Sequence, residues 1–154
     1  MMLENLQSNN IFAVALVAGS IVLLIYFAVK TLITSNRFQK GINLYQQQDY
    51  KAAEAAFRKV IAINSTNDVV HLFLGDSLMK QGKVAEAITE FKEIISRAPK
   101  KAEAYLRLSN ALMEEEKKEE AITNLKKAQE LLQAQRQPVK AKKVEELLQK
   151  ISQK

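Results

Sequence analysis

Hydrophobic and polar residues follow two different patterns along this chain, and the change comes near residue 34. Residues 11–29 form a run of nineteen residues without a charge, and apolar residues continue to Ile33. Beyond it, apolar side chains recur at spacings of three and four, the period of one helix face. The first pattern predicts a transmembrane helix over 11–33. The second predicts amphipathic helices over roughly 35–47, 51–63, 69–81, 85–97, 103–115 and 119–136.

The apolar run is long enough to cross a lipid bilayer. At about 1.5 Å per residue its uncharged part extends roughly 28 Å, close to the ~30 Å thickness of the hydrocarbon layer. The alternatives are a cleaved signal peptide, a buried core helix and an interfacial amphipathic helix. However, the run follows no basic segment and exceeds a signal-peptide core in length, it lies outside the amphipathic series, and it has no polar face.

The charges beside the run predict its orientation. Lys30, Arg37 and Lys40 follow it, whereas the short polar segment 1–10 before it carries only Glu4 as a charged side chain. Because basic residues favour the cytoplasmic side of a spanning helix, we expect the C-terminal domain in the cytoplasm or the stroma. Residues 34–36, Thr-Ser-Asn, are able to cap a new helix, so the span either ends there or continues into the next helix.

A repeat with a period of 34 residues runs through the amphipathic part. Its middle copy holds Leu74, Gly75, Leu78, Ala87, Phe91 and Pro99, and the flanking copies hold Gly41, Leu44, Ala53 and Phe57, then Ser109, Leu112, Ala121 and Leu125. Small residues at matched places let two antiparallel helices approach, and large apolar residues fill the space around the contact. We expect three helix pairs, 34–67, 68–101 and 102–135, closed by an amphipathic capping helix over 138–154.

These residues resemble the tetratricopeptide repeat (TPR) family, whose pattern places Leu-Gly in the first helix of each pair, and Ala, an aromatic residue and Pro in the second. The resemblance covers about residues 34–135 and implies an all-α solenoid. The composition favours helices as well, because two prolines and four glycines in 154 residues leave few helix breakers. Only the middle copy keeps Gly82 at its turn and Pro99 at its end, as expected when terminal repeats are atypical.

The sequence offers no candidate for catalysis, a metal or a cofactor. Cysteine is absent, and the single histidine, His71, stands where the family has a bulky packing residue. The acidic residues at 114–116 and 119–120 flank two lysines at a predicted turn, which is typical of a solvated loop. The chain has a net charge of +6, and the part from Lys30 onward carries +7, but no nucleic-acid module or basic stripe with aromatic residues accompanies it. We therefore expect neither an enzyme nor a nucleic-acid-binding protein.

The TPR resemblance implies protein binding, since in that family the first helix of each pair lines a groove for a partner segment. The candidate groove residues carried over to this chain are Phe38, Ile42, Tyr45, Leu72, Phe73, Met79, Leu106, Arg107, Asn110 and Met113, with Asp76, Lys80 and Glu114 on the same face. This mainly apolar set predicts a trough for an amphipathic or hydrophobic segment of a protein partner. The alternative is that several of these side chains only pack helices together.

The same positions argue against one ligand of TPR domains, the acidic C-terminal tails of heat-shock chaperones. Domains that bind these tails hold the carboxylates with Lys, Asn and Arg side chains. The equivalent positions here are Phe38, Ile42, Asp76, Glu103 and Arg107, of which only the last fits. We expect no binding of such tails.

The order of one span, three repeats and a capping helix resembles small membrane-anchored TPR assembly factors, such as the photosystem I assembly proteins of cyanobacterial and plastid thylakoid membranes. This resemblance implies a scaffold that holds a partner near the bilayer while a membrane complex, photosystem I in the specific case, is assembled. A receptor or adaptor in protein targeting or secretion, and a permanent structural subunit of a membrane complex, are the alternatives.

Overall fold

The computed structural model describes residues 2–153, with side chains described from Phe12 onward, and every regular element in this part of the chain is an α-helix. The helices are α1 (Met2–Gln46), α2 (Tyr50–Ile61), α3 (Asp68–Lys80), α4 (Val84–Arg97), α5 (Ala102–Glu114), α6 (Lys118–Ala134) and α7 (Pro138–Ser152). The chain divides into two units, Met1–Asn36 and Arg37–Lys154. The predicted all-α fold is confirmed.

The first unit is the N-terminal part of α1 and includes the predicted span. The segment Phe12–Gln46 contains a window with a mean hydropathy of 2.6, and none of that window is buried. By length and composition, this is the one helix in the described part of the chain that is suited to cross a bilayer. The alternative of a buried core helix does not fit this exposure.

The helix α1 continues through residues 34–36 and does not end there. Thr34 Oγ1 donates a hydrogen bond to the Lys30 carbonyl oxygen, at 2.7 Å, inside the same helix. Threonine makes this backward bond when it lies within a helix, whereas a cap would accept from amides ahead of it. Of the two possibilities left by the sequence, the structure therefore has the continuous one, and α1 also supplies the first helix of the first repeat.

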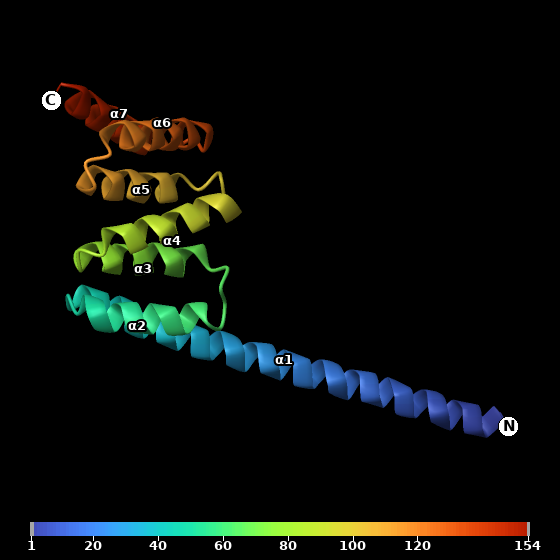
Figure 1. Cartoon of the computed structure of the whole chain (residues 1–154). Coiled ribbons are helices and arrows are strands. Elements are labelled where there is room, and N and C mark those ends of the chain that lie inside the picture. The colour runs from blue at the N-terminus through green and yellow to red at the C-terminus, as the bar shows by residue number, and fades with distance from the viewer. Residues whose placement is uncertain (1, 154) are drawn as a thin grey trace. The chain divides into compact units, whose positions relative to one another are not determined.

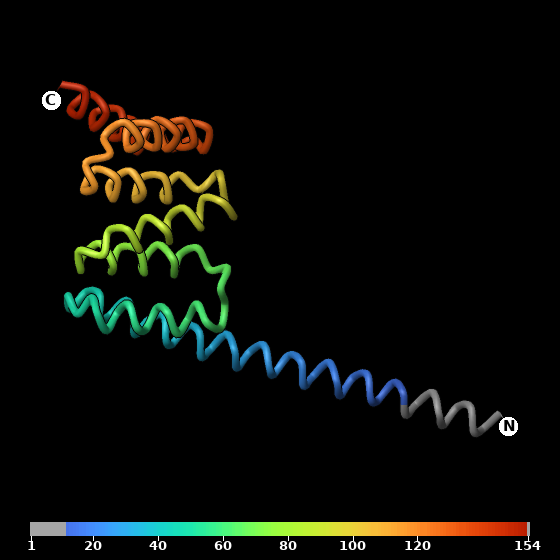
Figure 2. Tube along the Cα trace, viewed as in Figure 1, coloured from blue at the N-terminus to red at the C-terminus, as the bar shows by residue number. Residues whose placement is uncertain are grey.

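The second unit is a stack of antiparallel helices that follow one another in chain order (Figure 1). Each of α3 to α7 packs against the helix before it, and α3 also contacts α5. Figure 2 shows the same succession as the colour runs from cyan at α2 to red at α7. Helices α2 to α6 begin and end within two residues of the predicted limits. The 34-residue period of the sequence therefore corresponds to one pair of helices in the structure.

Close contacts between glycine and phenylalanine join the helices of the first two repeats. In the second repeat, a Cβ atom on Gly75 of α3 would overlap the ring of Phe91 of α4. In the first, a Cβ atom on Gly41 would lie 2.6 Å from Phe57 Cε1. Both rings are fully buried. The predicted approach of two helices at small residues is therefore confirmed.

The turn inside each repeat has the same backbone conformation. Gln48, Gly82 and Glu116 are spaced by 34 residues and have φ angles of 63°, 74° and 60°. Glycine adopts this left-handed region freely, whereas a residue with a side chain pays about 1–2 kcal/mol. The outer repeats therefore keep the turn because helix packing on both sides of it outweighs this local cost.

The last helix, α7, covers the end of the stack. Ala141, Val144 and Ile151 are buried in a cluster with Leu125 and Leu132 of α6. Burying this face removes apolar surface of the third repeat from water, which is the role expected of a capping helix.

Contacts of Glu54 link the first repeat to the second. Its carboxylate accepts hydrogen bonds from Lys83 Nζ at 2.8 Å, from Gln81 Nε2 at 2.9 Å, and from Arg58 Nε of its own helix at 2.9 Å. Burial alone would raise the pKa of Glu54, but these hydrogen bonds lower it from 4.5 to about 2. The ionised form is therefore favoured in the folded chain.

We expect this site to contribute stability that is lost on acidification. The pKa of Glu54 is lower in the folded than in the unfolded chain, so the contribution is complete above pH 4.5 and disappears as the pH falls towards 2. The replacement Glu54→Gln should cost about 1–2 kcal/mol at pH 7 and clearly less at pH 2.5, measured by urea unfolding. Glu86→Gln, at an exposed partner of Arg58, is the control. A cost of Glu54→Gln that does not change with pH would contradict this assignment.

Candidate functional site: the inner-helix surface

The inner-helix surface is formed by the first helix of each repeat, namely α1 from Arg37 onward, α3 and α5. A pocket of about 260 Å³ opens on it. Four of its lining residues belong to the predicted groove: Tyr45, Met79, Arg107 and Asn110. Of the other four, Asp76, Lys80 and Glu114 were expected on the same face, and Phe91 comes from α4. All three repeats thus contribute side chains to one hollow.

Arg107 lies at the wall of this pocket between two carboxylates. Its Nε donates to both carboxylate oxygens of Asp76 at 2.9 Å, and its Nη1 pairs with Glu103. Burial raises the pKa of the Asp76 carboxyl above its ordinary range, and the Arg107 guanidinium lowers it by less. Burial lowers the pKa of Arg107, but the two carboxylates raise it by more. The charge of Arg107 is therefore neutralised inside the domain.

The remaining pocket residues combine apolar and polar groups. Lys80, Asn110 and Glu114 are exposed at its edge, whereas Tyr45 and Met79 are half-buried. Burial raises the pKa of the Tyr45 phenol, so that the ring presents a neutral wall. Such a pocket can take an apolar side chain while its rim binds polar groups beside it.

The predicted apolar trough is not continuous, because most of its aromatic residues pack against one another. The ring centroids of Phe38 and Tyr45 lie 5.8 Å and 6.0 Å from that of Phe73, and Phe73 stacks on the buried Phe57 at 5.7 Å. Ile42 is also packed against the core. For Phe38, Ile42 and Phe73 the structure agrees with the alternative interpretation, that they join helices to one another, whereas Tyr45 also lines the pocket.

Three more predicted groove residues lie apart from the pocket. Leu72 is only 6% exposed and belongs to the core, which corrects its assignment to the groove. The reason is that α3 is contacted by α2, α4 and α5 and so buries more of its circumference than an outer helix does. Leu106 packs against the second core cluster. Met113 lines a different hollow, of about 630 Å³, together with Leu147 of α7.

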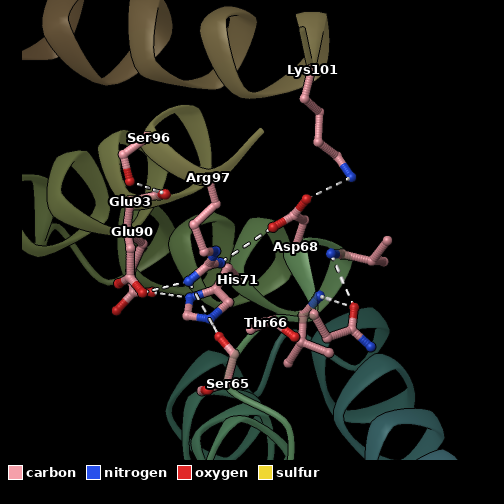
Figure 3. A network of polar contacts seen from close by, with 12 residues as sticks. Ser65, Thr66, Asp68, His71, Glu90, Glu93, Ser96, Arg97 and Lys101 are labelled. Carbon is pink, nitrogen blue, oxygen red and sulfur yellow. Dashed lines mark hydrogen bonds and ion pairs between the residues drawn. The ribbon is translucent and has the colours of Figure 1, made fainter. Parts of the chain in front are cut away.

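A separate polar network surrounds His71 between α3 and α4 (Figure 3). The imidazole is 3% exposed, with Nδ1 at 2.6 Å from Glu90 Oε2 and Nε2 at 2.9 Å from the Ser65 carbonyl oxygen. Since a carbonyl oxygen only accepts, Nε2 carries a proton. Arg97 donates to the same carbonyl oxygen at 3.2 Å and pairs with Asp68 at 3.2 Å. The network therefore ties the loop before α3 to α4.

This network also contains the one group of donor atoms in the described part of the chain with a spacing suited to a metal ion. Donor atoms of His71, Glu90 and Glu93 lie within 4.8 Å of one another. However, Nδ1 of His71 already pairs with Glu90, and Glu93 pairs with Arg97 Nη1 at 2.5 Å. Each carboxylate already has a partner within the protein, Glu90 in His71 and Glu93 in Arg97, so the geometry fits a structural network. The burial of His71 agrees with its predicted packing role.

Comparison with known proteins gives the class of this domain. Two models of the tetratricopeptide repeat family match the chain, one over residues 44–94 and the other over residues 73–136. The repeat domain is therefore a tetratricopeptide repeat domain. A comparison with curated proteins finds no match.

Solved TPR structures have the same fold. The type III secretion translocator chaperone SycD of Yersinia enterocolitica aligns with a TM-score of 0.72 and 21% identity, over 77% of this chain and 91% of SycD. SycD in complex with a peptide of the translocator YopD aligns with a TM-score of 0.66 and 18% identity, over 78% of this chain and 94% of SycD. The TPR2B domain of yeast Sti1, in its complex with pHsp70, aligns with a TM-score of 0.73 and 20% identity, over 78% of this chain and 96% of the Sti1 domain. None of the three is a photosystem assembly protein.

Proposed function

We propose that this chain is a membrane-anchored, non-enzymatic scaffold whose TPR domain binds a segment of a partner protein. The observation that carries the proposal is the pocket on the inner-helix surface, to which all three repeats contribute. Its neutral wall of Tyr45 and Met79, beside the polar rim, suits a segment that offers an apolar side chain next to polar groups. The binding site proposed here is smaller and more polar than the trough predicted from the sequence.

Membrane attachment is supported by the apolar part of α1, which is exposed along its length and matches a bilayer in thickness. The basic residues Lys30, Arg37 and Lys40 follow it and favour the cytoplasmic or stromal side for the TPR domain. The helix α1 runs to Gln46 and so includes both the apolar part and the first helix of the first repeat.

The process that this scaffold serves is the assembly of a membrane protein complex, with photosystem I as the specific case suggested by domain order. A secretion or targeting adaptor is the second candidate, favoured by the similarity to SycD and by its structure with a YopD peptide. Tails of heat-shock chaperones remain unexpected partners, because Asp76 and Glu103 neutralise the one arginine suited to hold a carboxylate.

The test of this function is to purify the tagged full-length chain from its native membranes in mild detergent and to identify its companions by mass spectrometry. Substoichiometric subunits of one membrane complex would support the assembly role and name the client, including photosystem I if that is the case. Translocase or secretion components would support the adaptor instead. Equal stoichiometry within a mature complex would indicate a permanent subunit and contradict the scaffold role.

Asn110→Arg should weaken binding of the partner so identified by about tenfold or more, which corresponds to ~1.4 kcal/mol. Asn110 is exposed at the pocket rim, where a guanidinium would fill the hollow and repel Lys80. The matched control is Gln133→Arg, an exposed position on α6 that adds the same charge outside the pocket. Binding measured by titration should change less than twofold in the control. An equal loss in both variants would exclude the pocket as the partner site.

A further inference from the structure

A second hollow, of about 470 Å³, lies between the end of α1 and α2 within the repeat unit. Its floor is apolar and includes Leu44 and Ala56. Its rim carries the exposed side chains of Arg37, Lys40 and Lys59. None of the described residues that line it is acidic. Three positive charges therefore surround an apolar depression, whereas the pocket on the inner-helix surface balances its charges internally.

The hollow lies in a basic part of the chain. Residues 30–61 carry six basic and two acidic side chains, a net charge of +4. Both acids have other roles, since Asp49 caps α2 by accepting from the Ala52 amide and Glu54 pairs with Arg58 and Lys83. The positive rim is thus left for an anion from outside the domain.

We infer that this basic hollow binds the headgroup of an anionic phospholipid, which rests on the membrane anchor of the proposed function. Arg37 follows Ile33 by four residues, so the chain itself keeps it within about 14 Å of the end of the predicted span. The lipid phosphate pairs with the three basic side chains, and the glycerol and first acyl carbons contact the apolar floor. Anionic lipids are enriched at the cytoplasmic surface, where the basic flank places this domain.

The occupant is a lipid, rather than an acidic protein or a free phosphate, for two reasons. The anchor holds the hollow at a high effective concentration of lipid headgroups, which no soluble anion shares. In addition, the apolar floor can contact the glycerol and acyl carbons of a lipid, which a free phosphate lacks. The three cations attract the net negative charge of an anionic headgroup, whereas the positive group of a zwitterionic headgroup largely cancels this attraction. Both features favour an anionic lipid over a zwitterionic one.

The test uses native mass spectrometry of the full-length chain in detergent with added phosphatidylglycerol, phosphatidylcholine or inorganic phosphate. Wild type should bind phosphatidylglycerol about tenfold more tightly than does the triple variant R37E/K40E/K59E. The control K92E/K126E/K142E makes the same charge change at exposed lysines outside the hollow and should bind like wild type. The neutral variant R37Q/K40Q/K59Q should show an intermediate loss, and circular dichroism verifies that each variant is folded.

Equal phosphatidylglycerol binding by wild type and both charge-reversal variants would overturn the inference. Equal binding of phosphatidylcholine, or a preference for inorganic phosphate, would also overturn it. Membrane attachment is measured separately, by flotation of native membranes after alkaline extraction. Loss of flotation would contradict both the membrane anchor and the proposed function. Normal flotation without a preference for the anionic lipid would contradict only the lipid site.

Discussion

Replacing Phe91 with alanine is expected to lower the free energy of unfolding by about 3–5 kcal/mol, the range for deleting a fully buried phenylalanine ring. The ring is 0% exposed and fills the space between α3 and α4, against Gly75. Urea unfolding followed by circular dichroism measures the effect. Lys92→Ala, at the exposed neighbour on the same helix, should change stability by less than about 0.5 kcal/mol.

A double-mutant cycle with Gly75 tests whether the ring itself causes the need for glycine. With Phe91 present, Gly75→Ala places a methyl group inside the ring and should cost about 1–3 kcal/mol. With Phe91→Ala the overlap disappears, and Gly75→Ala should become favourable by about 1 kcal/mol, because alanine is the better helix former. Additive effects of the two replacements would show that this contact does not set the helix spacing.

This contact also explains why the fold was predictable from the sequence. Gly75 and Phe91 recur one period earlier as Gly41 and Phe57, so the sizes of single residues at a fixed spacing identify the helix pairs. The helix limits follow from the same register. Such features are local in the repeat, and they need no knowledge of how distant segments meet.

The continuity of α1 could not be predicted in this way. Thr34 is able either to cap a new helix or to bond back to Lys30, and the local sequence does not distinguish the two. The structure has the backward bond. Residues beyond it, including Phe38 and Gly41, pack on α2 and α3 and do so in helical register with one another. The possible cap at residues 34–36 is therefore not used as the start of a new helix.

The position of the candidate site could be predicted from the sequence better than its polarity and shape could. The structure brings Tyr45, Met79, Arg107 and Asn110 together, yet it packs Phe38 and Phe73 of the expected trough against the core. Arg107 occupies the position in the third repeat that Phe73 occupies in the second, and Phe73 lies about one helical turn before Asp76. Since equivalent positions of neighbouring repeats lie side by side, the repeat register indicates that Arg107 and Asp76 are close. Nothing in the sequence, however, shows that this pair neutralises the arginine, since that depends on side-chain direction and burial.

The network around His71 shows the same dependence on burial, and it leads to the second large effect. Glu90→Ala should lower the free energy of unfolding by about 2–3 kcal/mol, because it leaves Nδ1 of an imidazole that is 3% exposed without a partner. Glu93→Ala, on the same helix at a 49% exposed side chain, is the control and should cost under about 1 kcal/mol. Urea unfolding at pH 7 measures both.

Glu90→Gln separates the hydrogen bond from the charge. A neutral imidazole that keeps its proton on Nε2 still donates to the Ser65 carbonyl oxygen and accepts at Nδ1 from the glutamine amide, so this variant should lose less than about 1 kcal/mol. The double replacement of His71 by Phe and Glu90 by Leu removes both polar groups and should also recover most of the loss. If Glu90→Ala cost no more than Glu93→Ala, Nδ1 of the imidazole would have another partner, and the assigned role of Glu90 would be wrong.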